Sequence, residues 1–182
     1  LEGLGFQGTV FIPTGDIGLM VGGEQQQILW EWKAMAKADA IVFWVCRDMH
    51  VLPGLTTNIE WGEWFHAGSF IHATVPSVMT PGNHEYRDGV LSSLWRPHFT
   101  LPENGPIEAL KETCYAIDYQ DMKLISIEAE GFDESKEARD AQVKWLDSVL
   151  RTNTKKWTTI TMHYPIYSTA KGRDNKELRE AF

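Results

Sequence analysis

An Asn-His-Glu triplet carries the densest chemistry in the sequence. Asn83, His84 and Glu85 follow a Pro-Gly turn, and the short apolar segment Val75–Thr80 precedes that turn. An amide oxygen can ligate a metal, an imidazole can transfer a proton, and a carboxylate can orient that imidazole. The triplet also fits a polar turn with a surface histidine, so the rest of the chain has to decide between the two.

Three other polar residues directly follow segments with the composition of strands. A lone aspartate in this position usually caps a turn or a helix, and a lone histidine is ordinarily a core or turn residue. Repetition at several strand ends favours a shared metal site, because carboxylates and imidazoles are common metal ligands. The residues are Asp16 after Gly8–Thr14, Asp48 after Ala40–Cys46, and His163 after Trp157–Met162.

Alternating strands and helices would bring these residues together. Apolar residues at helical spacing predict amphipathic helices over Glu24–Lys37 and Glu60–His72, which separate the first three strands. The continuous apolar character of Ala40–Cys46 is typical of a buried parallel strand. Right-handed crossovers in such a β-α-β-α-β unit place the strand ends at one edge of the sheet. We therefore expect Asp16, Asp48 and Asn83 to converge.

The second half of the chain predicts further elements around the same edge. Met122–Ile127 is expected to form a hairpin with the preceding strand, and the charged stretch Glu128–Asp140 reads as a solvated loop. Asp174 is a natural N-cap for the last helix. The predicted elements are a short helix Leu91–Trp95 closed by Pro97, a loop Pro102–Pro106, strands Cys114–Tyr119 and Met122–Ile127, a helix Ala141–Leu150 with Val143, Leu146, Val149 and Leu150 on one face, the strand Trp157–Met162 and a helix Asp174–Phe182.

Composition indicates one globular α/β domain. The 182 residues are 43% hydrophobic, include eight Trp and eight Phe, and carry a net charge of −8. That charge argues against nucleic acid or an anionic membrane as the main partner. The longest apolar run is too short to cross a bilayer and no basic, apolar leader opens the chain, so a soluble or already processed protein is expected. Cys46 and Cys114 are expected to be buried thiols.

The ordered motifs resemble those of the calcineurin-like metallophosphoesterases, and most closely the branch similar to purple acid phosphatases. Gly-Asn-His-Glu after an apolar strand is fairly specific, Asp-x-Gly is weak by itself, and the order and spacing together are strong. The resemblance covers nearly the whole chain. It rests on Gly15-Asp16-Ile17-Gly18, Asp48, Glu60–Phe65, Gly82–Glu85, Gln142, Trp145-Leu146 and Met162-His163.

The resemblance implies a phosphoesterase with two metal ions on paired β-sheets flanked by helices, in α/β/β/α layers. Asp16 would ligate the first metal, Asp48 would bridge both, and Asn83 and His163 would ligate the second. The metals would be Fe, Mn or Zn, and they would activate a hydroxide for in-line attack. The substrate would be a small phosphoester, and a secreted or periplasmic location is favoured.

The resemblance also gives roles to the other members of the triplet. His84 would contact the phosphoryl group and protonate the leaving oxygen as the general acid. Glu85 would orient His84.

The sequence departs from the family pattern at several positions. Arg47 replaces the glycine that normally precedes the bridging aspartate; it could bind phosphate, repel metals or mark a changed turn. Val51 stands where purple acid phosphatases have a tyrosine ligand, so a purple colour is not expected, and His50 is not expected to substitute. The family's final Gly-His-x-His motif is missing from residues 1–182. This chain alone is therefore expected to bind a single metal weakly, at the second site, and to turn over little substrate.

Two classes of function remain open at this point. The first is a metal-dependent phosphatase or phosphodiesterase domain; a nuclease or nucleotidase would differ from it only in substrate, and no basic, aromatic groove is evident. The second is a catalytically impaired pseudoenzyme or binding module that keeps the fold, which Arg47, Val51 and the missing histidines favour. The oligomeric state cannot be derived from the sequence.

Overall fold

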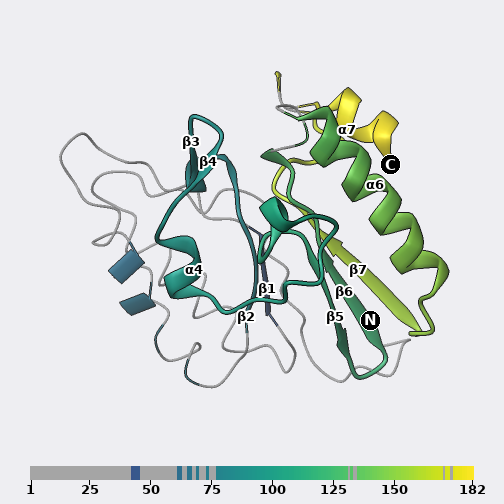
Figure 1. Ribbon diagram of the computed structural model, residues 1–182, viewed down its shortest axis with the longest axis horizontal. Helices are drawn as coiled ribbons and strands as arrows, with labels where there is room; N and C mark the ends of the chain where they lie inside the picture. Colours follow the sequence, from purple (N-terminus) through teal and green to yellow (C-terminus); the bar gives the residue numbers. More distant parts are fainter. Residues whose placement is uncertain are drawn as a thin grey trace.

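The protein has a mixed α/β structure built from small sheets and helices (Figure 1). The computed structural model describes residues 61–62, 65–66, 69, 73, 77–83, 85–130, 132, 135–169, 171–172 and 174–182, and the backbone alone for residues 42–45 and 84. The strand predicted at Gly8–Thr14 and the helix predicted at Glu24–Lys37 lie outside these residues.

Two parallel strands form the first sheet. β1 (Val42–Val45) pairs with β2 (Ser77–Thr80), with Val45 opposite Thr80 in the register. Val78, Met79 and Thr80 are buried, which confirms the prediction of a buried strand before the Pro-Gly turn. The predicted parallel pairing of neighbouring strands is confirmed as well.

A second sheet has the order β5-β6-β7. β5 (Tyr115–Tyr119) and β6 (Met122–Ser126) form the predicted antiparallel hairpin, and β7 (Trp157–Thr161) is parallel to β6. Gln120 has a positive φ of 48° in the tight turn of the hairpin. The α6 helix (Lys136–Arg151) runs along this sheet, and α7 (Lys176–Ala181) lies beside it (Figure 1).

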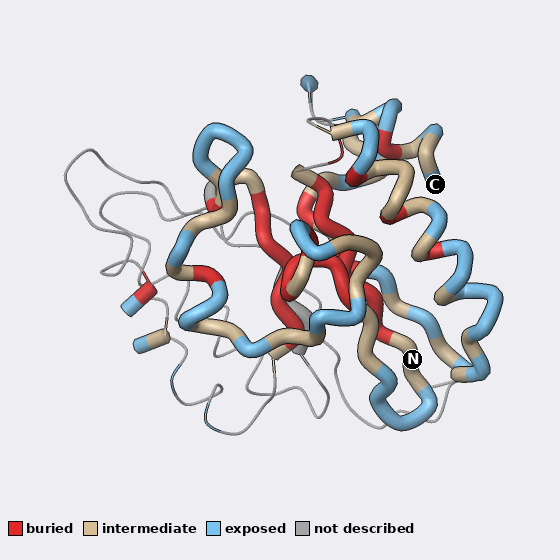
Figure 2. The backbone as a smooth tube through the Cα atoms, viewed as in Figure 1, coloured by how far each residue is buried: buried red, intermediate tan, exposed pale blue. Residues whose placement is uncertain are grey.

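The main core lies between this sheet and the two helices. Ile125 and Ile127 from the sheet side, Leu146 from α6 and Leu178 from α7 belong to one buried cluster. Ala138, Gln142 and Leu146 are the buried residues of α6, at the spacing of four that brings side chains to one helix face. Leu150, which was predicted on that face, is 42% exposed, since it lies in the last turn. Figure 2 shows buried residues concentrated in the central strands and exposed residues at the hairpin turns.

The segment after the triplet corrects one prediction. The short helix begins later than predicted, at Trp95. β3 (Tyr86–Arg87) and β4 (Val90–Leu91) form a hairpin, and α4 (Trp95–His98) follows it. Asp88 and Gly89 both have positive φ, the geometry of a two-residue hairpin turn for which Asp-Gly is a strong signal. Pro97 lies within α4 because the first turn of a helix does not need its N–H groups.

The start of α6 also differs from prediction. The described residues between 128 and 140 do not form a solvated loop: Glu128, Ala129 and Phe132 are buried, and α6 begins at Lys136 with Ser135 Oγ accepting the Ala138 N–H as N-cap. The prediction gave too much weight to charge, although charged residues are good helix formers.

The N-cap of α7 is Asn175 rather than Asp174. Asp174 instead accepts hydrogen bonds from the Arg179 guanidinium at 2.8 and 3.1 Å. The Pro102–Pro106 segment is a loop, as predicted.

An aromatic cluster packs beside α4. Trp61, Gly62, Phe65, His66 and Ser69 are helical, in agreement with the predicted helix Glu60–His72. Trp61 is 2% exposed and stacks on His98 with ring centroids 5.1 Å apart. His66 is exposed, as expected of a surface histidine.

Candidate metal and phosphoester site

Three strands from the two sheets end at one point. Thr80, Ser126 and Thr161 are the last residues of β2, β6 and β7. The Thr80 and Ser126 hydroxyls are hydrogen-bonded at 2.9 Å, and the Thr80 hydroxyl lies 3.5 Å from that of Thr161. All three residues are 5% exposed or less. The carboxyl ends of strands from different sheets therefore converge, which is the arrangement that the sequence predicted for its strand-end residues.

Asn83 and His163 meet just beyond this junction. Asn83 starts the short helix η2 (Asn83–Glu85) after β2, and His163 is the second residue after β7. The Nε2 N–H of His163 donates to Oδ1 of Asn83 at 2.7 Å, across 80 positions of sequence. His163 is 8% exposed and Asn83 is half-buried. The structure thus brings together two of the four predicted metal ligands.

Glu85 is 3% exposed and holds the turn that presents Asn83. Its Oε2 accepts the backbone N–H of Gly82 at 2.8 Å, and its own backbone N–H donates to the Gly82 carbonyl oxygen at 3.1 Å. The backbone of His84 lies in the middle of this helix. The His84 side chain is outside the described atoms, so its predicted role as general acid, and the orienting role of Glu85 towards it, stay predictions.

Tyr86 continues the turn and reaches the end of β6. Its hydroxyl lies close to the Glu128 carboxylate and to the Thr113 side chain. Burial, followed by the negative charge of Glu128, raises the pKa of the Tyr86 hydroxyl well above its usual range, so the hydroxyl remains a donor. Glu128 is 1% exposed. The turn that carries Asn83 is thereby tied to the strand next to that of His163.

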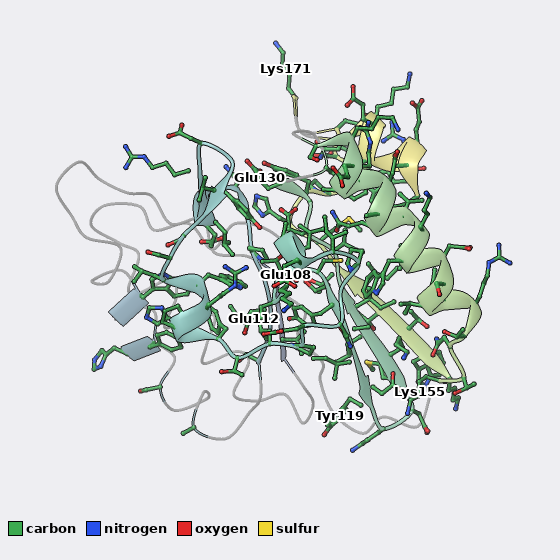
Figure 3. The ribbon with its side chains drawn as sticks, in the orientation of Figure 1. Glu108, Glu112, Tyr119, Glu130, Lys155 and Lys171 are labelled. Atoms are coloured by element: carbon green, nitrogen blue, oxygen red, sulfur yellow. The ribbon has the colours of Figure 1, made fainter. Side chains whose placement is uncertain are left out.

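Tyr164 makes the equivalent connection from the other side. It directly follows His163, with the two ring centroids 4.7 Å apart. Its hydroxyl donates to Oε2 of Glu130 at 2.5 Å, a length typical of a hydroxyl on a charged carboxylate. Glu130 lies near the carboxyl end of the second sheet, far from Tyr119 and Lys155 at the opposite end (Figure 3).

The segment between β6 and α6 is itself held in place. The buried Gln142 side chain accepts the Glu128 N–H at 3.0 Å and donates to the Glu128 carbonyl oxygen at 2.9 Å. Glu128 Oε1 accepts the Glu130 N–H at 2.8 Å, and the Ile127 N–H donates to the Thr161 carbonyl at 2.9 Å. Gln142, which the sequence noted only as part of the resemblance, fixes the backbone beside the site.

The remaining predicted ligands, Asp16 and Asp48, lie outside the described residues, as do Arg47, His50 and Val51. Within the described ranges, no three His, Cys, Asp or Glu side chains gather closely enough to hold a metal ion. The described ligand pair combines an imidazole with an amide oxygen, so the pair alone does not amount to such a group.

The chemistry of the described pair suits a divalent cation. Two ligand atoms bound to a tetrahedral metal at roughly 2.0–2.2 Å lie about 3.4 Å apart, so a metal would require Asn83 and His163 to separate slightly from their hydrogen-bonded distance of 2.7 Å. Because an amide oxygen only accepts, His163 carries its proton on Nε2 here. Ligation through Nε2 requires the imidazole to move that proton to Nδ1, so a metal would replace the hydrogen bond between the two residues.

Sequence reasoning missed four residues that shape this site. Glu128 and Glu130 were assigned to a solvated loop, and Tyr86 and Tyr164 were given no role. A signal was present, since each tyrosine lies directly after a predicted site residue and Glu128 is the first residue after the predicted strand Met122–Ile127.

A scan against models of known protein families and a search of curated protein sequences both find no match to this chain. In the part of the chain that the structure describes, no helix has the length and apolar character needed to span a membrane. The function therefore has to be argued from the site itself.

Proposed function

We propose that the protein is a metal-dependent phosphoester hydrolase, a phosphatase or phosphodiesterase of the metallophosphoesterase type. The observation that carries this proposal is the 2.7 Å contact between Asn83 and His163 at the junction of two sheets. These two residues were selected from the sequence as ligands of one metal, and they lie 80 positions apart. Binding sites of α/β proteins lie at the carboxyl ends of strands, so an amide oxygen and an imidazole that meet there support the proposal of a shared metal.

The layered fold of that family belongs to the same proposal. Thr80 joins the ends of the first and second sheets through Ser126, and the Tyr115 hydroxyl donates to the Met79 carbonyl at 2.5 Å. Contacts of this kind between a two-stranded parallel sheet and a three-stranded sheet are compatible with two facing sheets in α/β/β/α layers. A single domain of this type over residues 1–182 remains part of the proposal.

The residues have distinct roles under this proposal. Asn83 and His163 would hold one metal together with Asp48, and Asp16 with Asp48 would hold the other. Fe, Mn or Zn would supply Lewis acidity and neutralise charge on the phosphoryl group. His84 would protonate the leaving oxygen, and Glu85 keeps the turn that carries His84 and Asn83 in shape through its bond to Gly82.

Metal analysis combined with hydrolysis of p-nitrophenyl phosphate and bis(p-nitrophenyl) phosphate tests the function. We expect weak binding of one metal and little turnover by residues 1–182, and two metals with turnover by a chain extended past Phe182. Asn83→Ala should lower metal content in both forms. An extended chain that binds two metals but hydrolyses neither ester would contradict the hydrolase proposal and favour a pseudoenzyme. A wild-type metal content in Asn83→Ala would contradict the proposed metal site.

A further inference from the structure

Two tyrosines tie the turns that carry the proposed ligands to one short segment. Tyr86 is three residues after Asn83, and its hydroxyl lies close to the Glu128 carboxylate. Tyr164 is next to His163 and donates a hydrogen bond to Glu130. Both glutamates lie in the segment Glu128–Glu130 that follows β6. The two turns come from different sheets, so this segment is a common anchor for them.

The anchor is rigid before any ligand arrives. Gln142 from α6 binds both backbone groups of Glu128, and the Glu128 carboxylate also receives the Glu130 N–H. Glu128 is 1% exposed and Gln142 is 0% exposed. A charged or polar group buried to this extent must keep its partners, so Glu128 has few alternative positions.

Stability alone is a poor reason for this arrangement. Buried carboxylates lose their hydration, and well-packed apolar side chains of similar volume are often equally stabilising or more so. Buried hydrogen bonds to charged groups, in contrast, fix a geometry, because each acceptor oxygen demands its donor at a set distance and angle. Metal ligands need such fixing, and loss of groups that orient ligands typically lowers metal affinity.

We propose that Tyr86 and Tyr164 are positioning residues that, through Glu128 and Glu130, hold the turns of Asn83 and His163 side by side so that both residues can bind one metal ion. The inference rests on the proposed function and goes beyond it, since it assigns the orientation of the ligands to four residues that do not contact the metal. One contact comes from the turn that carries Asn83 and the other from the turn that carries His163. Loss of either lets one ligand turn move relative to the other.

The test measures Zn²⁺ affinity by isothermal titration of the 182-residue protein. Tyr86→Phe and Tyr164→Phe keep the rings and remove only the hydroxyls, and each is expected to weaken binding at the site about 10–100-fold. Tyr119→Phe is the matched control, because Tyr119 is 41% exposed at the other end of the sheet. The part of the titration heat that is absent in His163→Ala is taken as binding at the site.

Conservative variants separate positioning from simple support of the fold. Glu130→Gln keeps an oxygen that accepts the Tyr164 hydroxyl and should retain most of the affinity, whereas Glu130→Leu should lose it to the same extent as Tyr164→Phe. Thermal midpoints are measured for each variant. Wild-type affinity in both tyrosine variants, or an affinity loss that only follows the loss of stability, overturns the proposal.

A second readout keeps the inference independent of the proposed function. If the wild-type chain binds no Zn²⁺, the proposed metal site is wrong. The positions of His163 and Asn83 are then followed in the metal-free protein. The Nε2 proton of His163, bonded to Asn83, should exchange with water at least several-fold faster in Tyr164→Phe than in Tyr119→Phe, as seen by NMR. Equal exchange rates would contradict the positioning role whether or not a metal binds.

Discussion

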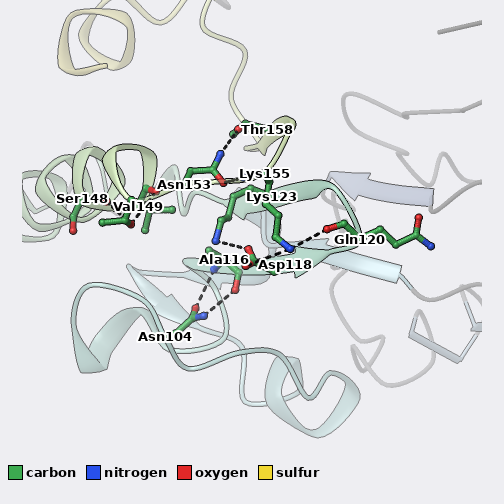
Figure 4. Close-up of polar contacts among 11 residues, drawn as sticks. Asn104, Ala116, Asp118, Gln120, Lys123, Ser148, Val149, Asn153, Lys155 and Thr158 are labelled. Atoms are coloured by element: carbon green, nitrogen blue, oxygen red, sulfur yellow. Dashed lines mark hydrogen bonds and ion pairs between the residues drawn. The ribbon is translucent and has the colours of Figure 1, made fainter. Parts of the chain in front are cut away.

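The two ends of the three-stranded sheet use polar residues in opposite ways. Where β6 and β7 end, polar side chains such as Glu128 and His163 are buried and bonded across long stretches of sequence. Around the β5–β6 turn, Asp118 is half-exposed and forms ion pairs with Lys123 and, at 3.9 Å, with Lys155 (Figure 4). One end fixes a geometry and the other remains in contact with water.

The difference follows from the surrounding medium. A hydrogen bond at an exposed turn exchanges with bonds to water, so its net contribution is small and its loss is readily compensated. A buried donor or acceptor that loses its partner has no water to replace it, so the whole desolvation cost appears as lost stability. Sites that must hold ligands within a narrow range of positions therefore belong at the buried end. Four predictions test this comparison.

Removal of a ligand at the buried end should have the largest effect. His163→Ala removes the imidazole that contacts Asn83, and we expect a loss of Zn²⁺ affinity greater than the roughly 10–100-fold typical of residues that only orient ligands. His66→Ala, which removes an exposed histidine, should leave the affinity unchanged. Titration calorimetry measures both. Equal losses in the two variants would mean that the metal binds at the protein surface.

Two amide side chains allow a direct comparison of a buried position with an exposed one. Gln142 binds the N–H and carbonyl of the buried Glu128, and Asn104, which is exposed, binds the same two groups of Ala116 at 3.0 and 2.8 Å (Figure 4). Gln142→Leu should lower the free energy of unfolding by about 2–5 kcal/mol, because two buried backbone groups lose their partners. Asn104→Leu should cost less than about 1 kcal/mol. Urea unfolding measures both, and equal costs would refute the comparison.

Packing at the buried end should tolerate little added volume. A Cβ at Gly105 would lie 2.1 Å from the Cys114 carbonyl oxygen, a backbone atom that cannot move aside alone. Gly105→Ala should therefore destabilise the fold by about 1–3 kcal/mol. Gly62 is the control, since a Cβ there meets nothing within 4 Å on its helix, and Gly62→Ala should stabilise by about 0.4–1 kcal/mol. Thermal unfolding compares the two variants. A Gly105→Ala protein as stable as the wild type would mean that the loop around Gly105 adjusts to the added methyl group.

Patterns of hydrophobic residues predicted the strands around the site well. The β2, β6 and β7 strands lie where apolar runs and turn residues placed them, and the rule that parallel strands expose polar residues at their carboxyl ends led from these runs to Asn83 and His163. These features are local or follow from strand topology. The parallel pairing of β1 with β2 is of the same kind.

Contacts between distant segments were beyond the reach of sequence patterns. The Glu128–Asp140 stretch is rich in charge, and charge alone indicated solvent, yet Gln142, Tyr86 and Tyr164 provide partners that let Glu128 and Glu130 approach the core. Burial of a carboxylate depends on partners from other elements, so it is decided by tertiary structure. The β3–β4 hairpin is a different case, because its Asp88-Gly89 signal was local and was overlooked.

The smallest effect is expected at the exposed end, as a dependence on pH and salt. The hydrogen bond from the Lys123 ammonium holds the pKa of the Asp118 carboxyl below its usual range. A lowered pKa in the folded state adds stability that is complete above the ordinary value of about 3.9 and is lost as the pH falls through the lowered value. The urea midpoint of the wild type should thus exceed that of Asp118→Asn near neutral pH, and the difference should shrink in acid. Because the pair is exposed, 1 M NaCl should also reduce the difference, whereas the cost of Gln142→Leu should not change with salt. A pH-independent difference between wild type and Asp118→Asn would show that Asp118 acts through packing, and the contrast between the two ends would then be one of volume rather than of charge and water.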